Sequence, residues 1–285
     1  MSAKASENTG GRKPSGLAGA LYSSASLILV LVFLLPLLWI FSLSLKTNRE
    51  TLSPALFPES PQPENYVRAW KQFGLGQFFL NSFVLTVFSV GVTVLAAMFA
   101  AYGFTKLRFR GSETLFVTLL MGVIIPPAAL IVPLLIEMRH LGLYNSRMGL
   151  SLVYVALGLP IATLILRGFF DGIPHELVEA ARLDRCSETK IMFRVLAPLA
   201  RGGIVTVIIL LFLANWNEFI LAFVSLRDVQ KYTLPVGIQS QIGQYTSEYH
   251  LIAASSVIAS IPVFAIYLAL QQQFERGIAE GALKA

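Results

Sequence analysis

The sequence predicts an all-α integral membrane protein with six transmembrane helices. Its 285 residues are 55% hydrophobic and 13% charged, about half the charged fraction of a typical soluble domain. The hydrophobic residues gather in runs of roughly 20, the length that an α-helix needs to cross the hydrocarbon core of a bilayer. Lys and Arg are also unevenly divided between the polar segments that separate these runs. Composition, run length and charge distribution therefore all indicate a polytopic membrane protein.

Six apolar runs give the expected spans. The first run is longer than the apolar region of a cleaved signal peptide, which has about 7–15 residues, so we expect it to be retained. The third contains three prolines, whose freed backbone carbonyls require packing against neighbours or a wet cavity. The spans are predicted at 20–45, 78–104, 114–136, 148–166, 204–224 and 251–270.

The polar segments set the orientation. They are a basic tail (1–19), a first external loop (46–76), the segment 172–203 inside a core of 77–270, and a C-terminal tail (271–285). Of the 22 Lys and Arg, 14 lie in the two tails, the turn around Lys106 and the stretch from Arg167 to Arg201. Cytoplasmic loops carry the excess of such residues. We therefore expect both termini and segment 172–203 to be cytoplasmic.

Several functions are excluded by missing motifs. The single Cys186 cannot form an internal disulfide or a cysteine metal cluster. The three His are far apart, and no nucleophile–base or paired-carboxylate arrangement is visible, so neither a catalytic nor a metal site is predicted. No P-loop is present, so ATP would have to be bound by another subunit. The net charge of +6 reflects membrane orientation rather than nucleic-acid binding.

Segment 172–203 reads as two short helices joined by a turn. Pro174 suits the first turn of a helix, and Leu177, Ala180 and Ala181 follow it as an apolar stripe at helical spacing. Ser187 is placed to cap a second helix. Pro198 then disturbs that helix before the next apolar run.

The same segment resembles the EAA loop of ABC importer permeases, and in particular that of the maltose-type sugar permeases. The resemblance is carried by Glu179, Ala180 and Ala181, by Asp184 at the sixth position, and by Leu196-Ala197-Pro198. It implies a cytoplasmic coupling helix seated in a cleft of an ATPase subunit. Arg185 stands where the family usually has Gly. If the turn requires a left-handed backbone, a Cβ there costs roughly 1–2 kcal/mol.

The resemblance extends over about 78–285 and implies the type I ABC importer permease fold in a bacterial or archaeal inner membrane. The chain would form half of a sugar translocation pathway, surrounded by membrane lipid. Its implied partners are a second homologous permease, an external substrate-binding protein and two ATPase subunits, which would hold ATP and magnesium. The alternatives are an ordinary amphipathic surface loop, a glycerol-phosphate-type ester importer, or a secondary transporter working alone.

A polar cluster interrupts the fifth apolar run. It consists of Asn215, Trp216, Asn217 and Glu218. A carboxylate at a helix centre costs about 2.5–3.5 kcal/mol on insertion scales, so Glu218 should face a cavity or a partner. The cluster is either part of the solute pathway or a hydrogen-bonded clamp between helices. Glu218 is also the only in-membrane coupling group available to a stand-alone transporter.

The last outer loop and the C-terminal tail carry further resemblances. The stretch Tyr232–His250 resembles the segment by which maltose-type permeases contact their binding protein, and it contains the polar side chains Gln239, Gln241, Gln244 and Tyr245. Polar loop residues require no such purpose, so a simple solvated loop is the alternative. The tail resembles the family's C-terminus, which packs between the ATPase subunits.

Overall fold

The computed structural model describes residues 17–107, 109–244 and 248–282, and this part of the chain is helical without strands. Side chains at 17–22, 243–244, 270 and 272–282 lie outside the description. The helices in chain order are α1 (Leu17–Ser44), α2 (Glu64–Gln72), α3 (Leu75–Tyr102), α4 (Ser112–Ile124), α5 (Pro127–His140), α6 (Arg147–Asp171), α7 (His175–Leu183), α8 (Glu188–Ile191), α9 (Ala197–Leu199), α10 (Arg201–Trp216), α11 (Ile220–Ser225), α12 (Leu234–Gln244) and α13 (Tyr249–Ala282). Two π-helical segments, Gly103–Leu107 and Met192–Leu196, and two 3-10 turns, Asn48–Glu50 and Val229–Lys231, complete the set.

Four helices, α1, α3, α6 and α13, are long and apolar enough to cross a membrane, and two bent pairs raise the number to six. The predicted spans at 20–45, 78–104, 148–166 and 251–270 each fall on one of these helices. Each of the four helices begins before its predicted start, and α6 and α13 also continue past their predicted ends. Most notably, α13 continues to Ala282, so the predicted tail 271–285 is helical up to that residue.

The third span is broken, contrary to the prediction of one helix over 114–136. The axes of α4 and α5 meet at 103°. Ile125 and Pro126 between them are both extended, and both precede a proline, which disfavours the helical conformation of the residue before it. The consecutive prolines at 126 and 127 therefore end one helix and begin another.

The fifth span is also interrupted. The helix α10 has 16 residues, which span about 24 Å at 1.5 Å per residue and fall short of the bilayer core. Its continuation within the predicted span 204–224, α11, begins only after a break at 217–219. At its other end α10 meets the α8–α9 segment at 84°. Helices α2 and α12 likewise occupy loops in which no helix was predicted.

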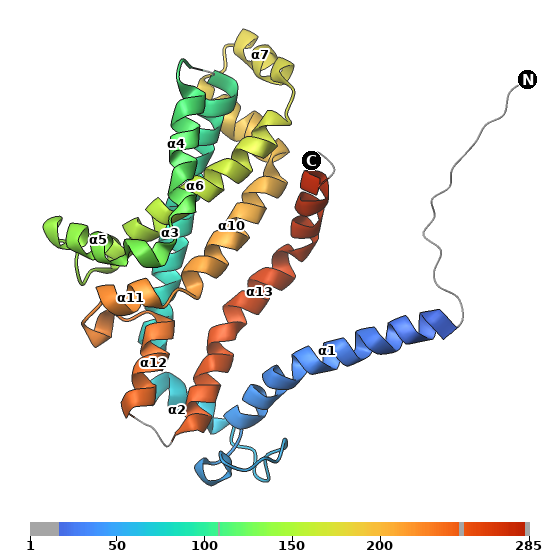
Figure 1. The fold of residues 1–285 in the computed structure, drawn as a ribbon, viewed down its shortest axis with the longest axis vertical. Helices are drawn as coiled ribbons and strands as arrows, with labels where there is room; N and C mark the ends of the chain where they lie inside the picture. Colours follow the sequence, from blue (N-terminus) through green and yellow to red (C-terminus); the bar gives the residue numbers. More distant parts are fainter. Residues whose placement is uncertain (1–16, 108, 245–247, 283–285) are drawn as a thin grey trace, which may run out of the picture.

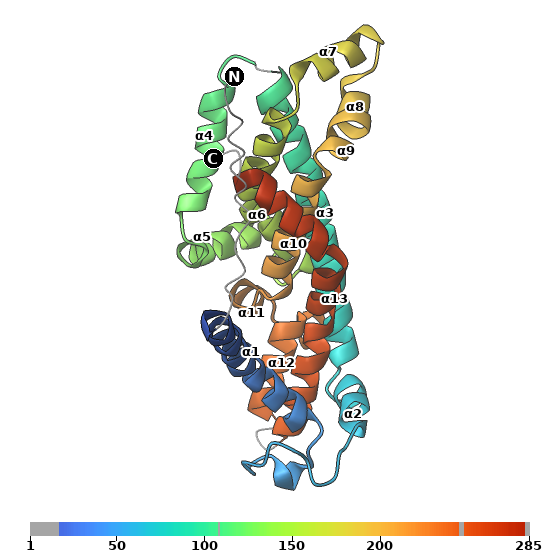
Figure 2. The ribbon, with the colours of Figure 1, turned by 90° about the vertical axis from the view of Figure 1, so that its right-hand side faces the viewer.

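The long helices form a bundle with functional loops at opposite ends. In Figures 1 and 2, α7 lies at one end of the molecule and α2 and α12 lie at the other. The first helix, α1, leans away from the body and contacts α13. Only 6% of the most apolar stretch of this helix is buried within this chain. The arrangement places segment 172–203 and the first loop on opposite sides, as six spans require.

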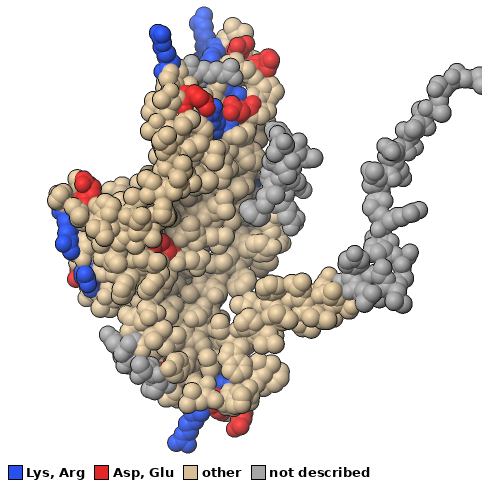
Figure 3. Space-filling view, in the orientation of Figure 1, with Lys and Arg blue, Asp and Glu red and all other residues tan. Residues whose placement is uncertain are grey.

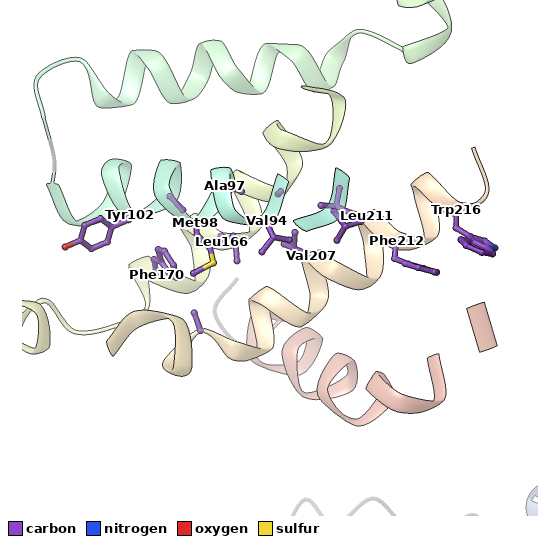
Figure 4. Packing of buried hydrophobic residues seen from close by; sticks show 14 of the residues in the cluster. Val94, Ala97, Met98, Tyr102, Leu166, Phe170, Val207, Leu211, Phe212 and Trp216 are labelled. Atoms are coloured by element: carbon purple, nitrogen blue, oxygen red, sulfur yellow. The ribbon is translucent and has the colours of Figure 1, made fainter. Parts of the chain in front are cut away.

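The buried core lies where α3, α6 and α10 meet. Figure 4 shows Val94 and Ala97 of α3 beside Leu166 of α6 and Val207 of α10. Small residues let these helices approach closely. A Cβ added to Gly158 of α6 would lie 2.8 Å from a Leu211 methyl group. The three helices thus form the closely packed centre from which the loops extend.

Candidate functional site

The predicted turn in segment 172–203 closes α7 in a Schellman motif. The Arg185 N–H donates to the Arg182 carbonyl at 2.9 Å, and the Cys186 N–H donates to the Ala181 carbonyl at 3.0 Å. Arg185 lies between them with a φ of 55°. This is the left-handed conformation that glycine usually adopts at this position. The turn therefore does require a left-handed backbone, and Arg185 carries the expected strain of roughly 1–2 kcal/mol.

A charged network ties the two halves of the segment to α3. Arg182 of α7 forms a bidentate contact with Glu188 of α8, at 2.9 and 3.1 Å, and the Tyr102 hydroxyl donates to the same carboxylate. The hydrogen bonds from Arg182 lower the pKa of Glu188, and the bond from Tyr102 adds to the effect. The carboxylate is therefore held ionised between three elements.

A second tie comes from Lys106, in the basic turn that the sequence analysis counted among the cytoplasmic segments. Its side chain is buried, and Nζ donates to the Ile173 carbonyl at 2.7 Å, directly before α7. Ile173 and Val178 of this segment are themselves buried. The segment is consequently docked against α3 and the π-helical segment Gly103–Leu107 that follows it, and is not an independent surface loop.

The exposed face of α7 differs by one residue from the predicted stripe. Leu177 is 44% exposed and Leu183 is 84% exposed, and Ala180 lies on the same open side. Ala181, which the prediction grouped with them, is half-buried against the core. Val178 and Ala181 hold α7 in place, and Leu177, Ala180 and Leu183 form what we term the open stripe.

The acidic positions of the motif lie beside this stripe, and its proline lies farther along the chain in α9. Glu179 and Asp184 are both exposed, and Asp184 is the C-cap residue of α7. Ser187 stands at the N-cap of α8 but makes no capping hydrogen bond. Pro198 lies in α9, next to the 84° bend into α10, as its disruptive effect predicts.

The polar cluster of the fifth span is used to anchor the end of α10. The Asn215 amide donates to the Ser89 hydroxyl of α3 at 2.9 Å. Trp216 is buried, and its indole N–H donates to the Ala259 carbonyl of α13 at 3.0 Å. Both contacts are of the clamp type, because they join α10 to neighbouring helices.

Glu218 stabilises the start of α11. Its carboxylate accepts the backbone N–H groups of Leu221 at 2.7 Å and Ala222 at 3.0 Å. It also accepts the buried hydroxyl of Tyr154 from α6 at 2.6 Å. Charged acceptors of this kind satisfy the open donors at a helix N-terminus. The carboxylate is thus the joint between the two halves of the fifth span and α6.

Two cavities flank the break at 217–219. One, of about 410 Å³, is lined by Asn215 and Glu218 together with Pro127 and Ile131 of α5 and Tyr154 of α6. The other, of about 250 Å³, is lined by Asn217, Phe219 and Gln239, with Trp216 and Ser256 beside them. The structure therefore divides the predicted cluster between two sides of the span.

The predicted binding-protein contacts are not a single surface. Gln239 is exposed and shares the smaller cavity with Asn217. Gln241 is buried, and its amide donates to the Phe73 carbonyl at 3.3 Å, so its expected outward contact is wrong. Gln244 ends α12 with its side chain outside the description, and Tyr245 lies outside the described residues.

Several residues of these sites were not predicted. Tyr102, Tyr154 and Ser89 lie inside long apolar helices, and each hydrogen-bonds a residue far along the chain. The available signal was their polarity, because a buried hydroxyl requires a partner. The identity of that partner depends on which helices are neighbours, which periodicity does not reveal.

Comparison with known proteins defines the family. The description "Binding-protein-dependent transport system inner membrane component" matches residues 93–280. A diacetylchitobiose uptake permease of Streptomyces coelicolor is 32% identical, over 93% of this chain and 89% of the relative. A sulfoquinovosyl glycerol transport permease of Agrobacterium fabrum is 36% identical, over 91% and 92%. A trehalose transport permease of Mycobacterium tuberculosis is 32% identical, over 88% and 92%.

Solved structures agree with this assignment at the level of fold. A bacterial ABC transporter that imports the acidic polysaccharide alginate includes a chain that superposes with a TM-score of 0.79 at 24% identity, covering 90% of this chain and 96% of that chain. The likeness identifies the fold as that of an ABC importer permease. Fold, multiple membrane spans and sequence together show that this chain belongs to the family of inner membrane components of binding-protein-dependent transport systems.

Proposed function

We propose that this chain is one of two permease subunits of an ATP-driven importer that takes up a sugar or oligosaccharide. The second permease would be homologous, an external binding protein would deliver the solute, and two ATPase subunits would bind ATP and magnesium. The termini and α7 would face the cytoplasm. The three named relatives are described as permeases for a chitobiose derivative, a sugar glycerol and trehalose, which supports a carbohydrate solute.

The observation that carries the proposal is the construction of α7. It presents the open stripe of Leu177, Ala180 and Leu183 at one end of the molecule. On its other side, Arg182 and Glu188 tie it to Tyr102 of α3. A partner that binds the open stripe would therefore move a segment that is attached to α3, one of the helices that form the core. This is the mechanical requirement for coupling ATP hydrolysis to transport.

The solute path is proposed to pass the break at 217–219. Side chains on both sides of the break suit a sugar, because amide and carboxylate groups accept or donate to hydroxyls and aromatic rings stack on the sugar face. Asn217 and Gln239 supply amides at the smaller cavity, beside Phe219. The described contacts of Asn215, Trp216 and Glu218 favour positioning of the helix ends over direct contact with the solute.

Reconstitution tests the proposal. The chain is co-expressed with its companion permease and ATPase, placed in proteoliposomes, and supplied with the binding protein and a panel of labelled sugars that includes chitobiose, trehalose and sulfonated glycerol glycosides. We expect uptake of at least one sugar that requires ATP inside and the loaded binding protein outside. Uptake without the ATPase would indicate a secondary transporter and overturn the proposal.

Orientation is tested separately with a single cysteine. Ser187→Cys is introduced in a Cys186→Ser background and treated with a membrane-impermeant maleimide. Labelling is expected in inverted vesicles and not in intact cells. Labelling from outside intact cells would place α7 on the wrong side for an ATPase.

A further inference from the structure

The end of α5, the loop that follows it and the loop after α11 are joined by hydrogen bonds into one unit, which we call the outer platform (residues 139–147 and 226–231). Asn145 is its joint and has a φ of 54°, a conformation that Asn adopts more readily than most residues. Its side-chain oxygen accepts the N–H groups of Arg227 at 2.9 Å and Asp228 at 3.2 Å. Its amide donates to the Asp228 carboxylate at 2.9 Å, and its own N–H donates to the Ser225 carbonyl at 3.1 Å.

The platform presents guanidinium groups around one tyrosine. Arg227 Nε donates to the Tyr144 hydroxyl at 2.8 Å, and the Arg139 guanidinium lies 4.7 Å from the centre of the same ring. The hydrogen bond from Arg227 lowers the pKa of Tyr144, and Arg139 adds to this effect. Arg139 and Arg227 are both exposed. Figure 3 shows blue side chains gathered at the left-hand edge, where α5 ends in Figure 1.

These charges are left uncompensated within the described part of the chain. There, the ion pairs include none for Arg139, Arg147 or Arg227, and Asp228 is paired instead with Lys231 at 2.7 Å. Among the described residues, the Arg147 side chain donates a hydrogen bond to the neutral Asn81 side chain. Arg147 and Lys231 also line a hollow of about 620 Å³ against α3. The platform thus combines exposed guanidinium groups with an adjacent socket that carries Arg147 and Lys231 and is largely apolar along α3.

We propose that the outer platform is a docking surface for an acidic patch on the external binding protein, with carboxylates bound by Arg139 and Arg227 and the adjacent socket receiving a further side chain. The inference rests on the proposed function, which places these loops outside the cell. Arginine holds carboxylates through paired N–H donors in a fixed plane. The platform is already ordered by its own hydrogen bonds, so docking should cost little additional conformational entropy.

A protein partner is favoured over a lipid headgroup by the setting. Arg227 and Lys231 stand in the loop between α11 and α12, and Arg139 lies in the last turn of α5. The family is described as binding-protein-dependent. A lipid phosphate would use the same donors, so the experiment removes it. The contact differs from the predicted one on α12, where Gln241 proved to be buried.

The test uses the complete importer in nanodiscs of phosphatidylcholine, which carry no anionic lipid. The measured quantity is the concentration of loaded binding protein that gives half-maximal stimulation of ATP hydrolysis, at low and at high salt. Arg139→Glu combined with Arg227→Glu should raise it about tenfold or more and remove most of its salt dependence, because charge complementarity controls encounter and register. The corresponding Gln pair should give a smaller rise. The maximal rate should stay unchanged in both.

The matched control is Arg49→Glu combined with Lys71→Glu, which makes the same charge change at exposed outer positions off the platform. It should leave the half-maximal concentration within about twofold of the wild type, if long-range attraction is a minor effect. An equal rise in both double variants, or no rise in the platform variant, overturns the proposal. An effect that appears only when anionic lipid is added points to a headgroup site and also overturns it. Failure of the wild type to respond to the binding protein would refute the proposed function itself.

Discussion

Removing the Glu218 carboxylate should weaken the fifth span at its break. In Glu218→Ala, three donors lose their acceptor: the N–H groups of Leu221 and Ala222 and the hydroxyl of Tyr154. All three residues are 5% exposed or less, so water cannot easily replace the carboxylate. The first turn of α11 and its contact with α6 depend on the same side chain.

The magnitude follows from the number of orphaned donors. Each buried unsatisfied group costs about 1–3 kcal/mol, so three give at least about 3 kcal/mol even if each is at the low end. Tyr154→Phe removes one donor and leaves the carboxylate with two backbone partners, which should cost about 1 kcal/mol. Glu218→Gln keeps one carbonyl oxygen and should fall between these values. Asn217→Ala is the control for stability alone, because Asn217 is exposed and its described side-chain hydrogen bond goes to the nearby Leu213 carbonyl of α10.

The assay is the thermal midpoint of the purified importer complex, read by size-exclusion chromatography after heating, together with transport in proteoliposomes. The expected order of midpoints is Asn217→Ala, Tyr154→Phe, Glu218→Gln and Glu218→Ala, from high to low. If Glu218→Ala is as stable as Asn217→Ala, the carboxylate does not join α11 to α6 and the argument fails. If Glu218→Gln assembles normally yet does not transport, Glu218 also acts on the solute.

Three further outcomes concern the coupling segment. Ala180→Trp should overfill the proposed ATPase contact, at a typical cost of about 1–3 kcal/mol, and Glu179→Lys should reverse the charge beside that contact. Both variants should lower ATPase co-purification and stimulated ATP hydrolysis together. Full ATPase retention and full hydrolysis in both variants would show that α7 is not the coupling element. Arg185→Gly should raise the thermal midpoint, because glycine relieves a left-handed strain of about 1 kcal/mol; a lower midpoint would show that the arginine side chain compensates. The pKa of Glu188 is lowered by Arg182. The stability that the ionised Glu188 gives to the α7 segment should therefore be complete above about pH 4.3, the ordinary pKa of Glu, and should fall progressively below it. Hydrogen exchange across α7 measures this, and Glu188→Gln should flatten the profile; an unchanged profile would contradict it.

The sequence predicted most of the membrane architecture because four spans are governed by length and hydropathy alone. The helices α1, α3, α6 and α13 contain enough consecutive apolar residues to be identified without knowledge of their neighbours. The third and fifth spans were wrongly predicted to be continuous helices, because prolines and polar residues end a helix locally even within an apolar run. The prolines at 126 and 127 split the third span, and the polar residues 215–218 coincide with the end of α10.

Features of the candidate sites that lie within one short stretch of sequence could be predicted, and features that depend on packing between distant segments could not. The Arg185 turn was anticipated in position because motif spacing is local, and its left-handed φ of 55° fits that reading. The faces of α7 were harder to assign, because Ala181 and Ala180 are chemically alike and only tertiary packing buries the former. Gln241 was misplaced for a related reason: its buried amide finds the Phe73 carbonyl on a loop far away in sequence.

The two breaks in the spans open onto one place. Pro127, from the break between α4 and α5, and Glu218 and Ile220, from the break between α10 and α11, all line the cavity of about 410 Å³. Non-helical backbone at membrane depth is stable only where protein covers it or where it borders a water-filled space. The lining of this cavity is largely aliphatic, with Tyr154, Asn215 and Glu218 as its polar groups, so both breaks are covered by protein at one shared place. Tyr154 and Glu218 join the second break to α6, whose other end leads directly into α7, so a displacement of α7 would have a continuous helix through which to reach the breaks.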